Sequence, residues 1–448
     1  MSKKYSLNTS TAVVIANMIG TGVFGSLGFQ LLGIHDFAAI IILWALGGLI
    51  AICGAFAYSE LGAALPRSGG EYNFLSEIFH PGIGFLSGWV SAIIGFSAPI
   101  AMAAFLLGGY FSNVIPGYDA RYIGAAVIIF ITIVQSLDYR VGGGFQSVAT
   151  GLKILLILMF VGCGFVLVHP QPVSFMPSHA TSVSIFSAAF ASSLVFVNFA
   201  YSGWNASSYI AGEIKNPTRN IPLSIITGTA IVTLLYVLLN FIFLYVAPAS
   251  EMAGKPDVAF VPATYIFGTN GGKVISLIIS MLLISTISSM IIAGPRVVQR
   301  MGEDFSVFQI VSHRNKNGIP ARAIWFQSII ALIILFTSSF ETILGYTTFV
   351  LTVFASLTVL GVMVLRFKQP HLARPYKTFG YPLTPLFFIA ANVWFMYFWV
   401  TSHTVPSLIG VGVVAVGGVV YFVADKLSIH KPEKTVTHTQ HTNHKATH

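Results

Sequence analysis

The chain has 448 residues, of which 55% are hydrophobic and only 8% are charged, and its mean hydropathy is +0.81. A water-soluble domain carries about 25% charged residues, so this composition excludes a soluble globular protein and indicates a membrane protein. The net charge of +9 does not call for a nucleic-acid partner, because an excess of basic residues in the loops on one side of a membrane accounts for it.

Apolar runs that can span the hydrocarbon core recur along the whole chain. The first run is too long for a cleaved signal peptide and leads into further apolar runs, and the run at 121–136 is the shortest. We predict an all-α integral membrane protein with twelve transmembrane helices at residues 12–34, 38–60, 82–111, 121–136, 144–168, 184–211, 221–247, 274–299, 322–338, 342–365, 382–401 and 404–424.

The basic residues predict the orientation. With twelve spans both termini lie on one side, and of the 23 lysines and arginines only Arg121, Lys255 and Lys273 fall in loops on the opposite side, with Lys153 inside a span. We therefore expect a multi-pass protein of the cytoplasmic (plasma) membrane with residues 1–11 and the tail at 428–448 in the cytoplasm. The tail is rich in histidine and threonine, and its composition favours disorder over metal binding.

The first span contains the stretch NMIGTGVFGS at residues 17–26. Glycine in a helix interior costs about 1 kcal/mol relative to alanine, so the glycines indicate either a very close helix contact or a segment that is not helical. In a membrane, an irregular backbone is tolerated only where it is buried in protein or lines a cavity. Transporters place such breaks at corresponding positions of two structural repeats.

The sixth span contains a second cluster of small residues, FAYSGWN at 199–205. The two clusters lie five spans apart, as an inverted repeat of five plus five helices requires, although the halves show no residue-level repeat. We predict broken helices 1 and 6, a first repeat at 12–168, a second repeat at 184–365 and two accessory helices at 382–424.

Two such breaks suit an α-amino acid zwitterion. An unwound backbone frees N–H groups for a carboxylate and carbonyl groups for an ammonium, and glycine allows close approach because it has no Cβ. Asparagines beside the breaks either line the cavity or hold helices together. The predicted substrate-binding residues are Met18, Ile19, Gly20, Thr21, Gly22, Phe199, Ser202, Gly203 and Asn205.

Lys153 lies inside the fifth span. An ionisable residue inside a membrane span is costly, so a functional role is the default hypothesis for it. Its ammonium is predicted to lie against the broken first helix, in place of a sodium ion, and to bridge to hydroxyl groups of the eighth span. The alternative is that it snorkels to the nearby cytoplasmic interface. The predicted coupling residues are Lys153, Ser285, Thr286, Ser288 and Ser289.

The acidic residues lie in loops or at span ends, so no carboxylate is expected at mid-depth to pair with a cationic side chain. The third span is small and apolar around residues 91–96, with a kink expected at Pro99. These features favour a substrate with a neutral side chain. The charged loops after the second and sixth spans are either merely solvated or form an intracellular gate. The predicted gating residues are Phe199, Trp204, Glu60, Arg67 and Glu213.

An ordered set of motifs resembles the amino acid–polyamine–organocation superfamily, which has a leucine-transporter-like fold. The motifs are IGTGVF (19–24), YSELGAALPRSGGEY (58–72), FAYSGWN (199–205), GEIKNPTRNIP (212–222) and GPRVVQRMGED (294–304). The resemblance extends from about Leu7 to Leu427.

By motif, this resemblance implies carboxylate binding at Thr21 and Gly22, a turn at Gly20 and a gating aromatic at Phe199. It implies ammonium binding by the carbonyl groups of Met18, Ile19, Phe199 and Ser202. Lys153 matches a lysine typical of the sodium-independent L-type and cationic amino acid transporter branches.

The chain departs from its relatives at three places. Ser202 replaces a frequent glycine, the eighth span has no tryptophan, and the loop at 112–119 has no cysteine for a covalently bound heavy chain. The absent tryptophan argues against cationic substrates.

We therefore predict a sodium-independent secondary transporter of neutral amino acids that works by alternating access, through exchange or proton coupling. The alternatives are a transporter of cationic amino acids or polyamines and, more remotely, a membrane sensor. The sequence shows no clustered catalytic constellation, so we predict no enzyme, no cofactor and no metal. The expected partners are an amino acid, lipid and, if transport is proton-coupled, protons, with no nucleic acid and no covalent heavy chain.

Overall fold

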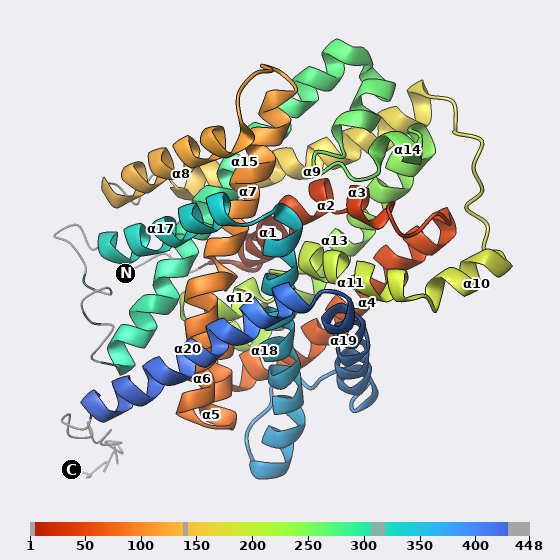
Figure 1. Ribbon diagram of the computed structural model, residues 1–448. Helices are drawn as coiled ribbons and strands as arrows, with labels where there is room; N and C mark the ends of the chain where they lie inside the picture. Colours follow the sequence, from red (N-terminus) through yellow and green to blue (C-terminus); the bar gives the residue numbers. More distant parts are fainter. Residues whose placement is uncertain (1–4, 138–141, 306–308, 310–312, 314–318, 429–448) are drawn as a thin grey trace, which may run out of the picture.

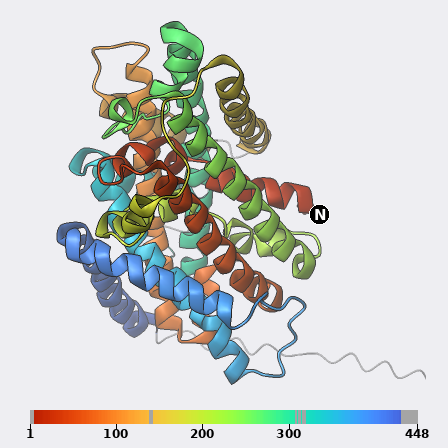
Figure 2. The same cartoon turned by 90° about the vertical axis from the view of Figure 1, so that its right-hand side faces the viewer.

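The computed structural model describes residues 5–137, 142–305, 309, 313 and 319–428. In this part of the chain the regular elements are helices, and a lone β-bridge joins Tyr5 to Ile214. Figures 1 and 2 show a bundle of long helices at varied tilts, with short helices between them. The predicted all-α class is confirmed in the described residues.

The first half of the chain runs from the broken first span to the bent pair that ends at Tyr201. Its helices are α1 (Leu7–Met18), α2 (Thr21–Gly25), α3 (Leu27–Gln30), α4 (Phe37–Ala64), α5 (Glu71–Ile78), α6 (Pro81–Val90), the π-helix η1 (Ser91–Gly95), α7 (Ser97–Ser112), α8 (Ala120–Leu137), α9 (Gly142–Leu167), α10 (His179–Ile185) and α11 (Ala188–Tyr201).

The second half begins after the break that follows α11. Its helices are α12 (Ala206–Tyr209), the 3-10 helix η2 (Ala211–Glu213), α13 (Pro217–Val246), α14 (Ala249–Met252), α15 (Phe260–Asp304), α17 (Ala321–Thr337), α18 (Phe340–Lys368), α19 (Leu383–Ser402) and α20 (Thr404–Ser428). Helix α15 is two helices joined at a kink at Gly268, whose φ is +72°.

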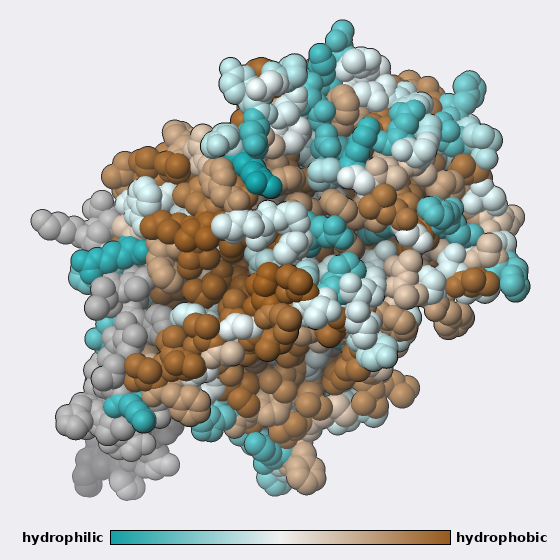
Figure 3. Space-filling model, viewed as in Figure 1, coloured by the Kyte–Doolittle hydropathy of each residue, from teal (hydrophilic) through white to brown (hydrophobic). Residues whose placement is uncertain are grey.

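Ten helices of the described chain are long and apolar enough to cross a membrane, or eleven if α10 and α11, which meet at 67°, form one span. The predicted shortest span corresponds to α8, which has 18 residues. Helix α17 is apolar but has only 17 residues, a length of about 26 Å against a hydrocarbon core of about 30 Å. In the face seen in Figure 3, hydrophobic residues gather over the middle of the bundle, as a lipid-facing surface requires.

Polar side chains fix the broken helices to the unbroken ones. The Tyr110 hydroxyl group donates to the carbonyl oxygen of Phe24 at 2.7 Å and so joins α7 to α2. The Trp44 indole donates to the Gln30 side chain at 2.9 Å, and the Tyr201 hydroxyl group donates to the Trp44 carbonyl oxygen at 3.0 Å. Since these groups are buried, each bond holds its helix in one position.

Glu60 belongs to the bundle's framework, because it joins α4 to α18 and to the segment that follows α18. Its carboxylate accepts two hydrogen bonds from Arg366, at 2.9 and 2.6 Å, and two from Thr378, at 2.7 Å each. Arg374 forms a further ion pair with it at 3.3 Å. These partners lie on α18 and the segment that follows it, and the gating role of Glu60 stays a prediction.

Glu60→Ala is expected to lower the free energy of unfolding by about 3–5 kcal/mol, because it leaves two partly buried arginines without their carboxylate. Thermal unfolding of the purified protein in detergent measures this effect. The control is Glu251→Ala, whose exposed side chain accepts a hydrogen bond from Tyr265. Equal melting temperatures for both variants would contradict the framework role.

Candidate functional site

The first span is broken between Met18 and Thr21. Helix α1 ends at Met18, and Gly20 lies in a conformation that is neither helical nor extended (φ −138°, ψ −138°) before α2 starts. No side chain caps the N-terminus of α2, so its first N–H groups have no side-chain partner. The break in the first span therefore lies within the glycine-containing stretch, as predicted.

The sixth span is broken between Ser202 and Asn205. Helix α11 ends at Tyr201, and the chain turns through Gly203, whose φ is +93°, before α12 begins at Ala206. A Cβ at Gly203 would lie 2.9 Å from the carbonyl oxygen of Asn17. Glycine is needed here for its positive φ and because the second break lies directly against the end of α1.

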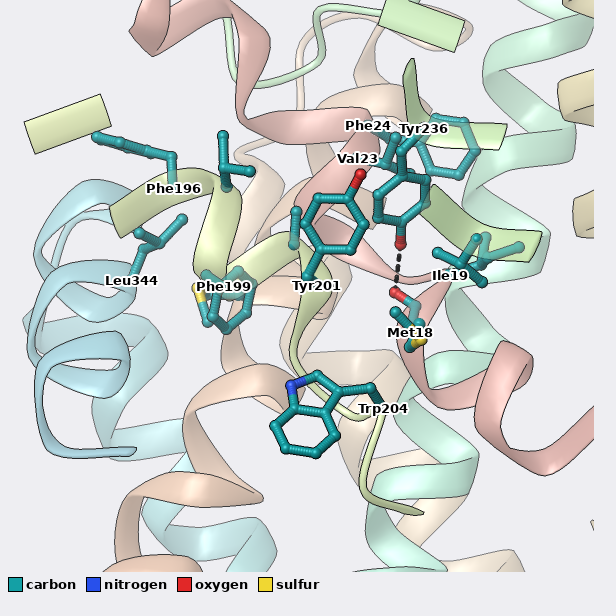
Figure 4. Packing of buried hydrophobic residues seen from close by; sticks show 14 of the residues in the cluster. Met18, Ile19, Val23, Phe24, Phe196, Phe199, Tyr201, Trp204, Tyr236 and Leu344 are labelled. Carbon is teal, nitrogen blue, oxygen red and sulfur yellow. Dashed lines mark hydrogen bonds between the residues drawn. The ribbon is translucent and has the colours of Figure 1, made fainter. Parts of the chain in front are cut away.

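Both breaks line one cavity of about 740 Å³. Helix α1 and its break contribute Asn17, Met18, Gly20, Thr21 and Gly22, and α11 with its break contributes Asn198, Phe199, Ala200, Ser202, Gly203, Trp204 and Asn205. Figure 4 shows Met18, Phe199 and Trp204 around the two chain breaks. Ile19 is fully buried and is not part of this lining. Eight of the nine predicted substrate-binding residues thus lie together at the cavity wall.

Two carbonyl groups that the sequence analysis expects to be unpaired have partners. The Tyr236 hydroxyl group donates to the carbonyl oxygen of Met18 at 2.5 Å (Figure 4). The N–H group of Ser202 donates to the carbonyl oxygen of Phe199 at 2.9 Å. Each carbonyl oxygen has two lone pairs, so each keeps one acceptor position beside the bond it already makes.

The glycines of the first span indicate either a close helix contact or a non-helical segment, and both explanations apply. A Cβ at Gly22 would lie 2.3 Å from the Cα atom of Ala200, so α2 and α11 touch through their backbones. A Cβ at Gly20 would meet the Thr286 methyl group at 3.5 Å and the Met18 carbonyl oxygen at 4.0 Å, both ordinary contacts. Gly22 is thus required by close packing, whereas Gly20 sits in the break itself.

Lys153 is buried, with 1% of its surface exposed, so it does not snorkel to the interface. Its Nζ atom donates to the Thr286 hydroxyl oxygen at 2.9 Å. Thr286 lines the cavity and its methyl group is the nearest neighbour of Gly20. The amine therefore connects α9 to α15 directly behind the first break.

Of the hydroxyl groups predicted to bridge to Lys153, those of Ser288 and Ser289 have other partners. Ser288 accepts a hydrogen bond from Gln135 of α8 at 2.6 Å. Ser289 lines the cavity and donates to the carbonyl oxygen of Thr286 at 2.8 Å, while Ser285 is fully buried. Of the four, Thr286 is the one with a hydrogen bond to Lys153 in the geometry described here.

Among the predicted gating residues, Arg67 and Glu213 both reach α15. Arg67 lies 3.7 Å from Asp304 and 3.9 Å from Glu77, and Glu213 lies 3.6 Å from Arg296. These groups are partly exposed, so each pair contributes little to stability. Glu213 and Arg296 line the cavity, and the gating roles of Arg67 and Glu213 stay predictions.

Trp204 and Phe199 are the aromatic residues of the second break. The Trp204 ring stands edge-on to Tyr58, with ring centroids 4.6 Å apart, and packs against Phe388 at 6.3 Å. Phe199 is 5% exposed and lines the cavity.

Two features of the cavity were missed by sequence reasoning. The third span contains a π-helix at Ser91–Gly95, which lines the cavity and precedes Pro99. Pro99 has no N–H group to donate to the carbonyl of Gly95, a signal that predicts a disturbed turn before the proline. π-turns of this kind often occur at functional sites.

The second missed feature is Glu71, a carboxylate in the cavity wall. It accepts hydrogen bonds from Tyr58 at 2.6 Å and from Asn205 at 3.1 Å. The cavity wall thus contains a carboxylate, although the sequence offers none at mid-depth of a span. The amide of Asn205, predicted to bind substrate, is used in part to hold this carboxylate.

A helical bundle of membrane-spanning length, with two broken helices that line one cavity, has the architecture of a membrane transporter. In the residues described, no three His, Cys, Asp or Glu side chains gather into a metal-binding group.

Comparison with known proteins identifies the family. Residues 5–422 match the amino acid permease family. The b(0,+)-type amino acid transporter 1 of Mus musculus is 29% identical over 388 residues, covering 84% of this chain and 79% of that protein. The serine/threonine exchanger SteT of Bacillus subtilis (strain 168) is 28% identical over 399 residues (88% and 90%). The large neutral amino acids transporter small subunit 2 of Homo sapiens is 26% identical over 459 residues (97% and 82%).

The chain belongs to the amino acid permease family, and it is an amino acid transporter and not an enzyme. The resemblance to the amino acid–polyamine–organocation superfamily is thereby confirmed.

Proposed function

We propose that the protein is a sodium-independent secondary transporter that moves neutral amino acids by alternating access. The observation that carries this proposal is the cavity that both helix breaks line. Backbone groups at Gly20, Thr21 and Gly22 receive the substrate carboxylate, and carbonyl oxygens of Met18, Phe199 and Ser202 receive its ammonium group. Ile19, buried below the wall, supports the turn.

The proposed topology is a twelve-helix, leucine-transporter-like fold. Counting α10 with α11 as one span and adding the short α17 to the other ten gives twelve. The distribution of basic residues supports a cytoplasmic location for both termini. The protein would then lie in the plasma membrane, with the Arg67 and Glu213 ion pairs on the cytoplasmic side.

Sodium independence is supported by Lys153. A buried ammonium group bonded to Thr286, next to the first break, supplies the positive charge that a sodium ion would supply there. The name of the relative SteT, an exchanger, supports exchange as the mode of coupling, although proton coupling is the alternative. The name of another relative includes the words "small subunit", but the loop at 112–119 of this chain offers no cysteine for a covalent partner.

Transport of cationic amino acids is the second candidate function. No carboxylate is expected at mid-depth of a span to pair with a cationic side chain, but Glu71 places one in the cavity wall.

Ligand analogues test the zwitterion site most directly. Alanine is expected to raise the melting temperature of the purified protein, because a ligand that binds only the folded state stabilises it. Alaninamide lacks the carboxylate and propionate lacks the ammonium group, so neither is expected to raise it. Stabilisation by propionate or alaninamide equal to that by alanine would contradict recognition of both charged groups.

A further inference from the structure

Glu71 is a buried carboxylate that no part of the proposed mechanism uses. It is the first residue of α5, which lies outside the membrane-spanning helices, and 5% of its surface is exposed. It lines the cavity together with Asn205 of the second break, to which it is hydrogen-bonded. It therefore faces the same space as the proposed substrate.

The two oxygen atoms of Glu71 differ in their surroundings. Oε1 accepts both hydrogen bonds, from the Tyr58 hydroxyl group at 2.6 Å and from the Asn205 amide at 3.1 Å. In the part of the chain that the structure describes, Oε2 has no hydrogen-bond partner and Glu71 has no basic partner. The other charged residues of the cavity wall, Glu213 and Arg296, lie 3.6 Å from each other.

A buried carboxylate without a cation is unstable in its ionised form. Burial is the main influence on Glu71 and raises its pKa to about 7, while the hydrogen bonds from Tyr58 and Asn205 act in the opposite direction. Near neutral pH the group therefore either takes up a proton or pairs with a cation that enters the cavity.

The charged groups on the elements around Glu71 do not decide whether it binds a proton or a cation. The titratable side chains that face it are the phenols of Tyr58 and Tyr209. Helices α6 and α18 also pack against α5, but their charged or basic groups are engaged elsewhere. His80 accepts a hydrogen bond from the N–H of Gly82, Arg366 binds Glu60, Lys368 donates to the carbonyl of Ile78, and Glu341 lies 3.9 Å from His403.

We propose that Glu71 determines specificity: with a proton bound it admits neutral substrates, and without one its Oε2 atom receives the side-chain ammonium or guanidinium group of a cationic amino acid. This inference rests on the proposed function, because the α-carboxylate and α-ammonium groups must occupy the two breaks. A cationic substrate and a proton then compete for one oxygen atom. Binding of a cationic amino acid should weaken as the pH falls, and binding of a neutral one should not.

Arginine and citrulline make a matched pair for the test, because their side chains are nearly the same size and only arginine is charged. Competition of each against radiolabelled alanine is measured on the purified protein between pH 6 and pH 8. For the wild type, the arginine affinity is expected to rise about tenfold over this range as Glu71 ionises, and the citrulline affinity to stay within about twofold.

Glu71→Gln keeps an oxygen acceptor for Tyr58 and Asn205 but removes the charge. It is expected to lower the arginine affinity at pH 8 about tenfold, to abolish its pH dependence and to leave alanine and citrulline nearly unchanged. Glu71→Asp should restore part of the arginine affinity, and Glu251→Gln, at an exposed site, should behave as the wild type. Melting temperatures verify that each variant is folded.

Two different failures can be told apart. Alanine binding with no preference for arginine over citrulline at pH 8, or an equal loss of all three ligands in Glu71→Gln, would overturn the role of Glu71 and leave the proposed function intact. Absence of alanine binding to the wild type at every pH would overturn the proposed function itself.

Discussion

Lys153→Ala is expected to reduce amino acid uptake to the background of empty liposomes. The change removes a buried ammonium group that holds Thr286 at 2.9 Å directly behind Gly20. Without that charge the first break loses the group that we propose to stand in for a sodium ion. Uptake is measured in proteoliposomes and normalised to the amount of protein that elutes as a single folded species.

Thr286→Val separates the hydrogen bond from the charge, because valine has nearly the same shape as threonine and no hydroxyl group. A hydrogen bond to a charged group contributes about 1.5–3 kcal/mol, so uptake is expected to fall about ten- to a hundredfold. The double variant should be no worse than Lys153→Ala alone, since both changes remove the same contact. Normal uptake by Lys153→Ala would contradict the proposal that its ammonium group takes the place of a sodium ion.

Gly22→Leu is expected to abolish transport by displacing α2 from α11. Its Cβ alone would lie 2.3 Å from the Cα atom of Ala200, and backbone atoms cannot move aside as a flexible side chain can. Overpacking of this kind costs about 1–3 kcal/mol or more, so the melting temperature should fall together with the uptake.

Gly20→Ala is the matched control, because its Cβ would make only an ordinary contact with Thr286. It should keep the melting temperature of the wild type and lower alanine binding, since the added methyl group lies in the break. If Gly22→Leu retained both its stability and its transport, the backbone contact between α2 and α11 would be wrong.

Much of the fold follows from hydropathy, because a helix in lipid must satisfy its backbone internally and needs a fixed length to cross. The ends of the spans were harder to predict. Helix α15 begins at Phe260, well before the predicted start at residue 274, because two helices join at the Gly268 kink. The His-rich tail at 428–448 lies almost wholly outside the described residues.

The breaks were predictable because glycine marks them, and Lys153 because a lysine inside an apolar run is conspicuous. Glu71 was not, since it belongs to a loop in the sequence and reaches the cavity only because α5 folds back beneath Asn205. The ion pairs of Glu60 were not predictable for a related reason. Its partners Arg366 and Arg374 are distant in the sequence, and nothing in the local motif indicates them.

The most direct test of the central claim is the uptake of radiolabelled alanine into proteoliposomes, with sodium replaced by potassium and with or without internal unlabelled alanine or an inward proton gradient. The account predicts uptake that is unchanged by the absence of sodium, inhibited by external neutral amino acids, and dependent on internal alanine or on the proton gradient. Uptake that strictly requires sodium would contradict it, because Lys153 would then not replace the ion beside the first break.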